Sequence, residues 1–237
     1  AAGTQTAGLA FGGGTPTVTA ITESYDGTTW TEVNDLNLAR YFLSGNGTQT
    51  SAIAVGGEIQ PGTDQNDSET WNGTNWTEAN NFNTARYALG CAAVDNTAAL
   101  IFGGDGPPPT TALTELYNGT NWTEVNDLNA AKSYMASIGS STAALAAGGY
   151  SAPGANVASN ESWNGTNWTE INDLNTARRA LAGAGTQTSG FAFGGYSTTS
   201  VGVTEEWDGI SWAEVADLAT ARANLDGTGT TSAALAF

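Results

Sequence analysis

Thr-Trp-Asn-Gly-Thr-Asn-Trp-Thr-Glu, residues 70–78, is the stretch that decides the fold of this chain. Near-copies of it recur along the whole sequence, and the second tryptophan of the five copies falls at Trp30, Trp76, Trp122, Trp168 and Trp212. The spacing is therefore 46, 46, 46 and 44 residues. Strand-like repeats of about 40–50 residues are typical of β-propeller blades, which bury their faces against one another. We predict an all-β fold in which residues 1–237 form a single five-bladed β-propeller domain.

One repeat, taken from residues 178–215, shows how a blade is built. Small side chains over 178–185 suit an innermost strand at a crowded axis. A second strand over 190–193 ends at Gly194-Gly195, where glycine permits a positive φ or a close backbone approach. A third strand follows over 204–207, Asp208-Gly209 is a hairpin signal, and 211–215 forms the fourth strand. The pattern predicts four antiparallel strands in each blade.

A basic residue lies ten positions after each repeated tryptophan. Five of the six basic residues of the chain occupy this place: Arg40, Arg86, Lys132, Arg178 and Arg222. A glutamate also recurs seven residues before each tryptophan. We expect each cation to pair with carboxylates of its own or the next blade. The repeated cations and tryptophans are thus predicted to be structural.

The two ends of the chain carry copies of the same segment. Residues 1–11 align with residues 227–237, and both copies end in Leu-Ala-Phe. We predict a ring closed by pairing of the N- and C-terminal segments, in which the segment from Ala223 supplies the innermost strand of the first blade. Leu9-Ala10-Phe11 is expected to hold the second-strand position of that blade, and the last residues to fray or to pair with another molecule. Because the chain begins with Ala1 and not with methionine, we expect it to be a processed product or part of a larger chain or assembly.

Composition argues against several classes of function. The chain has 23 acidic residues, 6 basic residues and no histidine, with a formal net charge of −17, which disfavours binding to nucleic acid or an anionic membrane. No apolar run approaches the roughly 20 residues needed for membrane insertion. Without histidine there is no His-based acid–base pair and no serine triad. We expect a protein that is not an enzyme and that uses no cofactor and no metal.

The repeat resembles the kelch repeat. The diglycine is matched at Gly56-Gly57 and Gly194-Gly195, an aromatic residue at Tyr25 and Trp71, and the downstream tryptophan in every copy. This resemblance covers essentially the whole chain, and it implies a propeller with a binding or scaffolding role. Phrases such as residues 163–170 are also similar to repeats in kelch-like proteins of marine bacteriophages. That likeness implies a virion-associated or tail-associated protein, in the virion or outside the cell.

The loops between second and third strands differ between copies, so they are the expected recognition surface. They cover residues 14–20, 58–67, 105–112, 150–159 and 196–202. The candidate binding residues in them are Glu58, Asp64, Asp67, Asp105, Tyr150 and Tyr196, whose alternative interpretation is an ordinary solvated loop. We therefore expect a binding or structural module that attaches to a protein or a surface glycan. The alternative is a multivalent lectin with equivalent sites between blades, at the five Asx-Gly-x-x-Trp turns.

Overall fold

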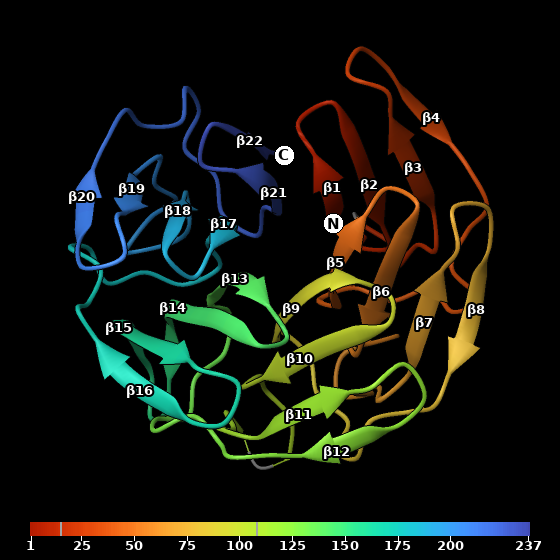
Figure 1. Cartoon of the computed structure of the whole chain (residues 1–237), viewed down its shortest axis with the longest axis horizontal. Coiled ribbons are helices and arrows are strands. Elements are labelled where there is room, and N and C mark those ends of the chain that lie inside the picture. The colour runs from red at the N-terminus through yellow and green to blue at the C-terminus, as the bar shows by residue number, and fades with distance from the viewer. Residues whose placement is uncertain (15, 108) are drawn as a thin grey trace.

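The computed structural model describes residues 1–14, 16–107 and 109–237; Thr15 and Pro108, in two of the variable loops, lie outside the described residues. It confirms the all-β prediction: five sheets of four antiparallel strands surround a central axis as a β-propeller (Figure 1). A further sheet of two strands lies at the C-terminal end. Within each blade the strands are hydrogen-bonded in chain order.

In each blade the first strand lies nearest the axis and the fourth strand lies outermost. Blade 1 consists of β1 (Ala2–Thr4), β2 (Ala7–Phe11), β3 (Thr22–Tyr25) and β4 (Trp30–Glu32). Blade 2 consists of β5 (Ser44–Thr48), β6 (Ser51–Val55), β7 (Ser68–Trp71) and β8 (Trp76–Ala79). Blade 3 consists of β9 (Gly90–Asp95), β10 (Ala98–Phe102), β11 (Thr114–Tyr117) and β12 (Trp122–Glu124). Blade 4 consists of β13 (Ala136–Ser140), β14 (Ala143–Ser151), β15 (Ala155–Trp163) and β16 (Trp168–Ile171). Blade 5 consists of β17 (Ala182–Thr186), β18 (Ser189–Phe193), β19 (Thr204–Trp207) and β20 (Trp212–Glu214). The two-stranded sheet consists of β21 (Gly227–Thr230) and β22 (Ala233–Ala236).

The innermost strand begins later than the sequence pattern predicts. In blade 5 it begins at Ala182 rather than at Arg178, because Ala180 has a left-handed backbone with φ of 53° that interrupts the extended chain. The same conformation recurs at Phe42, Ala88 and Tyr134, in the loops before blades 2, 3 and 4, and at Asn224 before β21. It aims the amide of this residue at the preceding blade: Ala88 N donates to Phe42 O, Tyr134 N to Ala88 O, Ala180 N to Tyr134 O and Asn224 N to Ala180 O, at 2.8–3.0 Å. We call this chain of hydrogen bonds the axial belt.

Buried ion pairs fix each loop to the blade that follows it. Arg40 Nη2 lies 2.8 Å from Glu69 Oε1, and the pair recurs as Arg86–Glu115, Lys132–Glu161 and Arg178–Glu205. Both side chains of each pair are at most 2% exposed. The second carboxylate oxygen of Glu69 accepts hydrogen bonds from the amide and the side chain of Asn37. One glutamate thus anchors the whole loop that connects two blades.

The repeated tryptophans pack between blades. Trp76 meets Phe11 of blade 1 edge to face at 4.9 Å, and its indole N–H donates to Thr22 Oγ1 at 3.0 Å. Trp168 repeats the arrangement on blade 3 with Phe102 and Thr114. The diglycine lies at the equivalent joint between blades 2 and 3: Gly57 N donates to Arg86 O, and a Cβ on Gly56, whose φ is 62°, would collide with that carbonyl. Glycine is therefore needed where the cation-bearing loop crosses the blade.

The prediction for ring closure was wrong for the inner strand of blade 1 and for the last residues, which were expected to fray or to pair with another molecule but pair within the chain. Residues from Ala223 do not supply the inner strand of blade 1, because β1 already pairs with β2 in that place. The C-terminal segment instead forms β21 and β22, which pair with each other. Leu9, Ala10 and Phe11 do hold the second-strand position, where they pair with β3. The two ends still meet, since the Ala1 ammonium forms an ion pair with Asp226 and Thr228 Oγ1 donates to Gly3 O.

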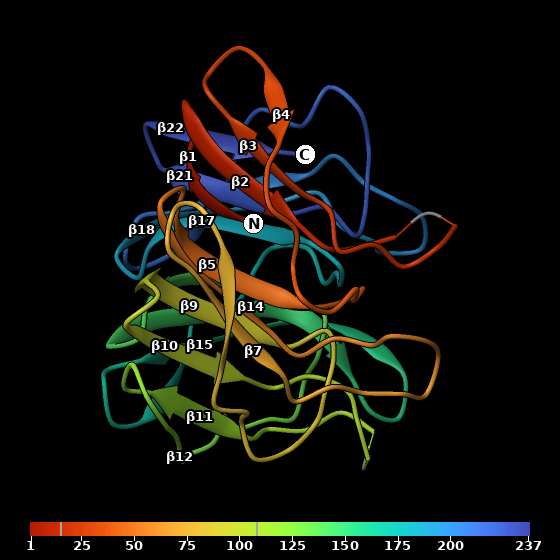
Figure 2. The same cartoon turned by 90° about the vertical axis from the view of Figure 1, so that its right-hand side faces the viewer.

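Alternate connections separate two faces of the ring, as Figure 2 shows. The short turns between first and second strands lie on one face with the Asx-Gly hairpins. The longer loops between second and third strands lie on the other, which we call the variable face. In the part of the chain that the structure describes, no helix is long and apolar enough to cross a membrane.

The glutamate of each buried ion pair should matter more for stability than the equivalent glutamate of blade 1, Glu23. We expect Glu69→Gln to lower the free energy of unfolding by about 3 kcal/mol, because it leaves the buried Arg40 without its counter-charge. Glu23 occupies the equivalent place in blade 1 but is exposed and forms no ion pair with any described residue. Glu23→Gln is therefore the matched control, with an expected cost below about 0.5 kcal/mol. Urea unfolding measures both, and equal losses would contradict this account.

Candidate functional site

Four of the six candidate residues occupy one repeated position. Glu58, Asp105, Tyr150 and Tyr196 each follow a diglycine directly. In blades 2–5 this residue forms an isolated β-bridge with the residue that follows the repeated cation, as in Tyr41↔Glu58 and Tyr87↔Asp105. The scaffold therefore presents a glutamate, an aspartate and two tyrosines at equivalent places around the axis of the variable face.

A cavity of about 430 Å³ lies between these positions. Glu58, Asp64, Tyr87, Asp105 and Tyr150 line it, together with Gly62, Gly106, Pro109, Thr110, Ala152 and Pro153. We call it the acidic pocket. It combines side chains from blades 2, 3 and 4, so it brings together four of the predicted binding residues, Glu58, Asp64, Asp105 and Tyr150, from three loops.

Local hydrogen bonds hold two of the carboxylates in place. Glu58 Oε1 accepts from the amide of Gly62 at 2.9 Å, which folds the blade 2 loop back over its own first residue. Asp105 Oδ1 accepts from the hydroxyl of Thr110 at 2.8 Å. The loops are therefore ordered by the same groups that make the pocket acidic.

Tyr196 lies beside the acidic pocket and is linked to it through Arg179. The guanidinium carbon of Arg179 lies 4.9 Å from the ring centroids of both Tyr150 and Tyr196. A cation placed over tyrosine faces at this distance gains a favourable electrostatic interaction. Arg179 is the one basic residue outside the repeat. Its position shows that a guanidinium group packs against tyrosine faces at the rim of this pocket.

Asp67 does not join the other candidates. Its carbonyl accepts from Arg40 Nη1 at 2.9 Å, and its carboxylate accepts from Asn81 at 3.4 Å. The residue therefore belongs to the joint between the loop and blade 2. The sequence showed an acidic loop residue there but not that the backbone of this residue serves the buried cation.

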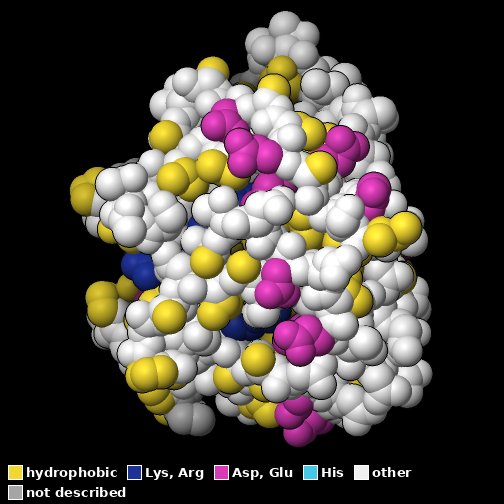
Figure 3. All heavy atoms as spheres, turned by 90° about the vertical axis from the view of Figure 1, so that its left-hand side faces the viewer, with side chains coloured by type: hydrophobic (Ala, Val, Ile, Leu, Met, Phe, Trp, Pro, Cys, Tyr) yellow, Lys and Arg dark blue, Asp and Glu magenta, His cyan; other side chains and the backbone are white. Residues whose placement is uncertain are grey.

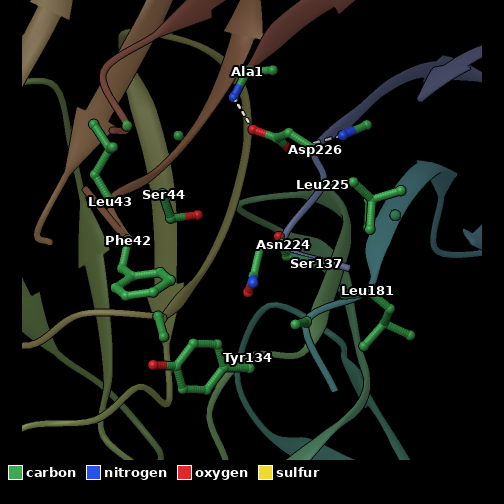
Figure 4. A pocket seen from close by; sticks show the side chains of 18 of the residues that line it. Ala1, Phe42, Leu43, Ser44, Tyr134, Ser137, Leu181, Asn224, Leu225 and Asp226 are labelled. Atoms are coloured by element: carbon green, nitrogen blue, oxygen red, sulfur yellow. Dashed lines mark hydrogen bonds and ion pairs between the residues drawn. The ribbon is translucent and has the colours of Figure 1, made fainter. Parts of the chain in front are cut away.

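An aromatic cluster formed by Tyr41, Phe42, Tyr87 and Tyr134 was not expected from the sequence. Phe42 lies 5.6 Å from Tyr134 and 6.1 Å from Tyr87 between ring centroids, and Tyr87 lies 6.3 Å from Tyr134. Phe42 and Tyr134 also line a central cavity of about 690 Å³, across from Asn224 and Asp226 (Figure 4). A signal was present: aromatic residues follow the repeated cation by one or two positions in three copies.

The electrostatics of the acidic pocket oppose further negative charge. Burial, followed by the nearby Glu58 carboxylate and then Asp105, raises the pKa of Asp64. Burial and then the charges of Asp105, Glu58 and Asp64 raise the pKa of Tyr87, and burial raises that of Tyr134 with smaller effects from Tyr87 and Asp105. Three carboxylates that repel one another are stabilised by a positive group placed among them.

Other sites are less well supported by the structure. Among the described residues, no group of three or more His, Cys, Asp or Glu side chains is placed to hold a metal ion. The outer side of the molecule seen in Figure 3 carries scattered acidic side chains, with basic ones visible at few places. The tryptophans of the Asx-Gly-x-x-Trp turns are 5–8% exposed in blades 2–5 and 36% exposed at Trp30. Equivalent sugar sites at these turns would thus lack an aromatic platform in four of the five blades.

The fold and the acidic pocket define a five-bladed β-propeller with one asymmetric cluster on its variable face. No protein-family model and no curated protein matched this chain in the comparisons.

The raised pKa of Asp64 has a testable cause. We expect Glu58→Gln to lower the pKa of Asp64 towards its ordinary value of 3.8, because the substitution removes the nearest like charge. Asp105→Asn should lower it less, since Asp105 contributes least. Carboxyl-carbon NMR titration measures both, and an unchanged pKa in Glu58→Gln would contradict this explanation. Because the folded state binds this proton more tightly than the unfolded state, the stabilising effect of the proton is full below the unfolded pKa of Asp64 and is lost as the pH rises through the folded pKa.

Proposed function

We propose that this chain is a non-enzymatic binding module that attaches to a partner through the acidic pocket. The observation that carries the proposal is the convergence of Glu58, Asp64 and Asp105 with tyrosine rings in one cavity on the variable face. The repeat itself does not require these side chains, because other blades carry different residues at the same place. Recognition by loops on a rigid scaffold is the general use of such an arrangement.

The chemistry of the pocket favours a protonated amine or a guanidinium group on the partner. Such a group gains Coulomb energy from the carboxylates and electrostatic attraction from the tyrosine faces. Its arrival also relieves the mutual repulsion that raises the pKa of Asp64. A lysine or arginine side chain of a partner protein provides this group, and so does an amino sugar on a surface glycan. We propose the protein partner, because the cavity adjoins a broad loop surface that one sugar would not cover.

We further propose that the propeller is displayed on a virion, in a tail or on a capsid, and mediates attachment to a host surface. The kelch-like pattern and the likeness of residues 163–170 to the repeats of marine phage proteins support this placement. The net charge of −17 supports a role outside nucleic-acid binding. Under this proposal the repeated ion pairs keep the ring rigid, while the variable face carries the specificity.

Binding to an array of basic peptides and glycans, and to host cells, tests the proposal. We expect the intact propeller to bind basic peptides, and Asp105→Asn or Tyr150→Ala to weaken that binding about tenfold, as the loss of one charged or aromatic contact would. Glu78→Gln is the matched control, because Glu78 is an exposed carboxylate of blade 2 outside the pocket.

The affinity for a basic peptide should fall as salt rises, because a partly exposed charge pair is screened. Binding of glycans without basic peptides would contradict the proposed partner class. Equal losses in Asp105→Asn and Glu78→Gln would show that the pocket is not the contact.

A further inference from the structure

The sheet of β21 and β22 occupies a sixth place in the ring, between blade 5 and blade 1 (Figure 1). It corresponds to the first two strands of a blade, since residues 227–237 align with residues 1–11. No described strand pairs with the outer edge of β22, whereas β2 pairs with β3 at the same place in blade 1. We call this sheet the half-blade.

Both sides of the half-blade reproduce the regular joint between blades. On the side of blade 5, the ring of Phe193 packs against Gly227, as the ring of Phe11 packs against Gly45. On the side of blade 1, Phe237 meets Trp30 edge to face at 5.3 Å and 61°. Phe11 and Trp76 make the same contact at 4.9 Å and 66°. The half-blade therefore packs against its two neighbours as a complete blade does, and it lacks only the third and fourth strands.

Two side chains beside the half-blade lack the partners of their counterparts. Arg222 is exposed, and no described carboxylate lies within ion-pair distance of it, while the other four repeated cations are buried against a glutamate of a third strand. Trp30 is 36% exposed, while Trp76 and Trp168 are each 5% exposed and donate to a threonine of a third strand. A single missing third strand accounts for both differences.

We propose that the half-blade is an acceptor for a polypeptide hairpin of the repeat's own pattern for third and fourth strands. Its first strand adds to the free edge of β22 through main-chain hydrogen bonds. Its glutamate pairs with Arg222, and its threonine hydroxyl accepts the Trp30 indole N–H. Residues 204–212, Thr-Glu-Glu-Trp-Asp-Gly-Ile-Ser-Trp, show the required pattern.

The register follows from blade 1. Phe11 pairs with Thr22 and Ala10 with Glu23, so the incoming threonine lies opposite Phe237 and the glutamate opposite Ala236. Side chains alternate along a strand, so the glutamate then points to the face on which Arg222 lies and the threonine towards blade 1. The unpaired charge of Arg222, the strand register and the packing on both sides of the half-blade thus all fit a hairpin with the repeat's own pattern.

A labelled peptide that copies residues 201–218 tests the proposal by fluorescence anisotropy with the whole chain. We expect saturable binding that weakens about tenfold in Arg222→Gln, or when the glutamate at peptide position 205 is changed to glutamine, as for loss of one charge-assisted hydrogen bond. The two changes together should cost little more than either alone. Changing the neighbouring glutamate at peptide position 206 to glutamine is the matched control and should leave the affinity unchanged.

A second measurement keeps the test decisive if the free peptide binds weakly, because an isolated hairpin is marginally stable in water. A copy of residues 194–218 is appended after Phe237, in the place those residues take after Phe193. We expect the melting temperature to rise by about 5 °C or more, and Arg222→Gln to remove part of the gain. Light scattering of the unextended chain should give a monomer.

Three results would overturn the proposal. They are an unchanged melting temperature on extension, peptide binding that ignores Arg222→Gln, and a dimer whose β22 edge is protected from hydrogen exchange. The last would mean that a second copy of the chain covers the edge.

Discussion

The buried pair between a repeated cation and the glutamate of the next blade is the interaction on which the rest of the structure depends. Burying a charge is costly unless it is paired and hydrogen-bonded, and each buried cation here has a carboxylate partner and also donates to a backbone carbonyl. The glutamate binds the cation with one oxygen and, in blade 2, the loop at Asn37 with the other. The cation also donates to the carbonyl of Gly56, which ends the second strand. One pair thus places the connecting loop, the inner edge of the variable loop and the third strand.

Much of the fold was predictable from the sequence because the residues that form the contacts between blades recur once in each repeat. Trp76, Gly56 and Arg40 all act at contacts between blades, so their period counts blades directly. The strand boundaries near Ala180 were less accessible, since a left-handed alanine is held by hydrogen bonds to neighbouring blades and has no local signature. The arrangement of the ends was also inaccessible. Two equivalent copies of one segment compete for a place, and local pattern does not distinguish β1 paired in its own blade from β21 paired there.

The candidate site was predictable in its location but not in its composition. The difference between loops indicated the variable face, and Glu58, Asp64, Asp105 and Tyr150 do line one cavity there. Tyr87, which also lines the cavity, comes from the loop before the inner strand of blade 3, directly after the repeated cation, where the sequence looks regular. Asp67 differs because its carbonyl, not its side chain alone, has a structural partner. Backbone roles of this kind depend on tertiary contacts that a single sequence does not record.

The axial belt has a consequence for how such a ring changes in evolution. In the loops that enter blades 3, 4 and 5 and the sheet of β21 and β22, an amide donates to the carbonyl of the equivalent residue one period earlier, and the belt uses backbone atoms, which every residue carries. A tandem duplication or a deletion of one whole period in the gene therefore inserts or removes a blade without requiring a new kind of contact. The number of blades can therefore change in whole steps during evolution, while the sequence of each loop changes independently of that number.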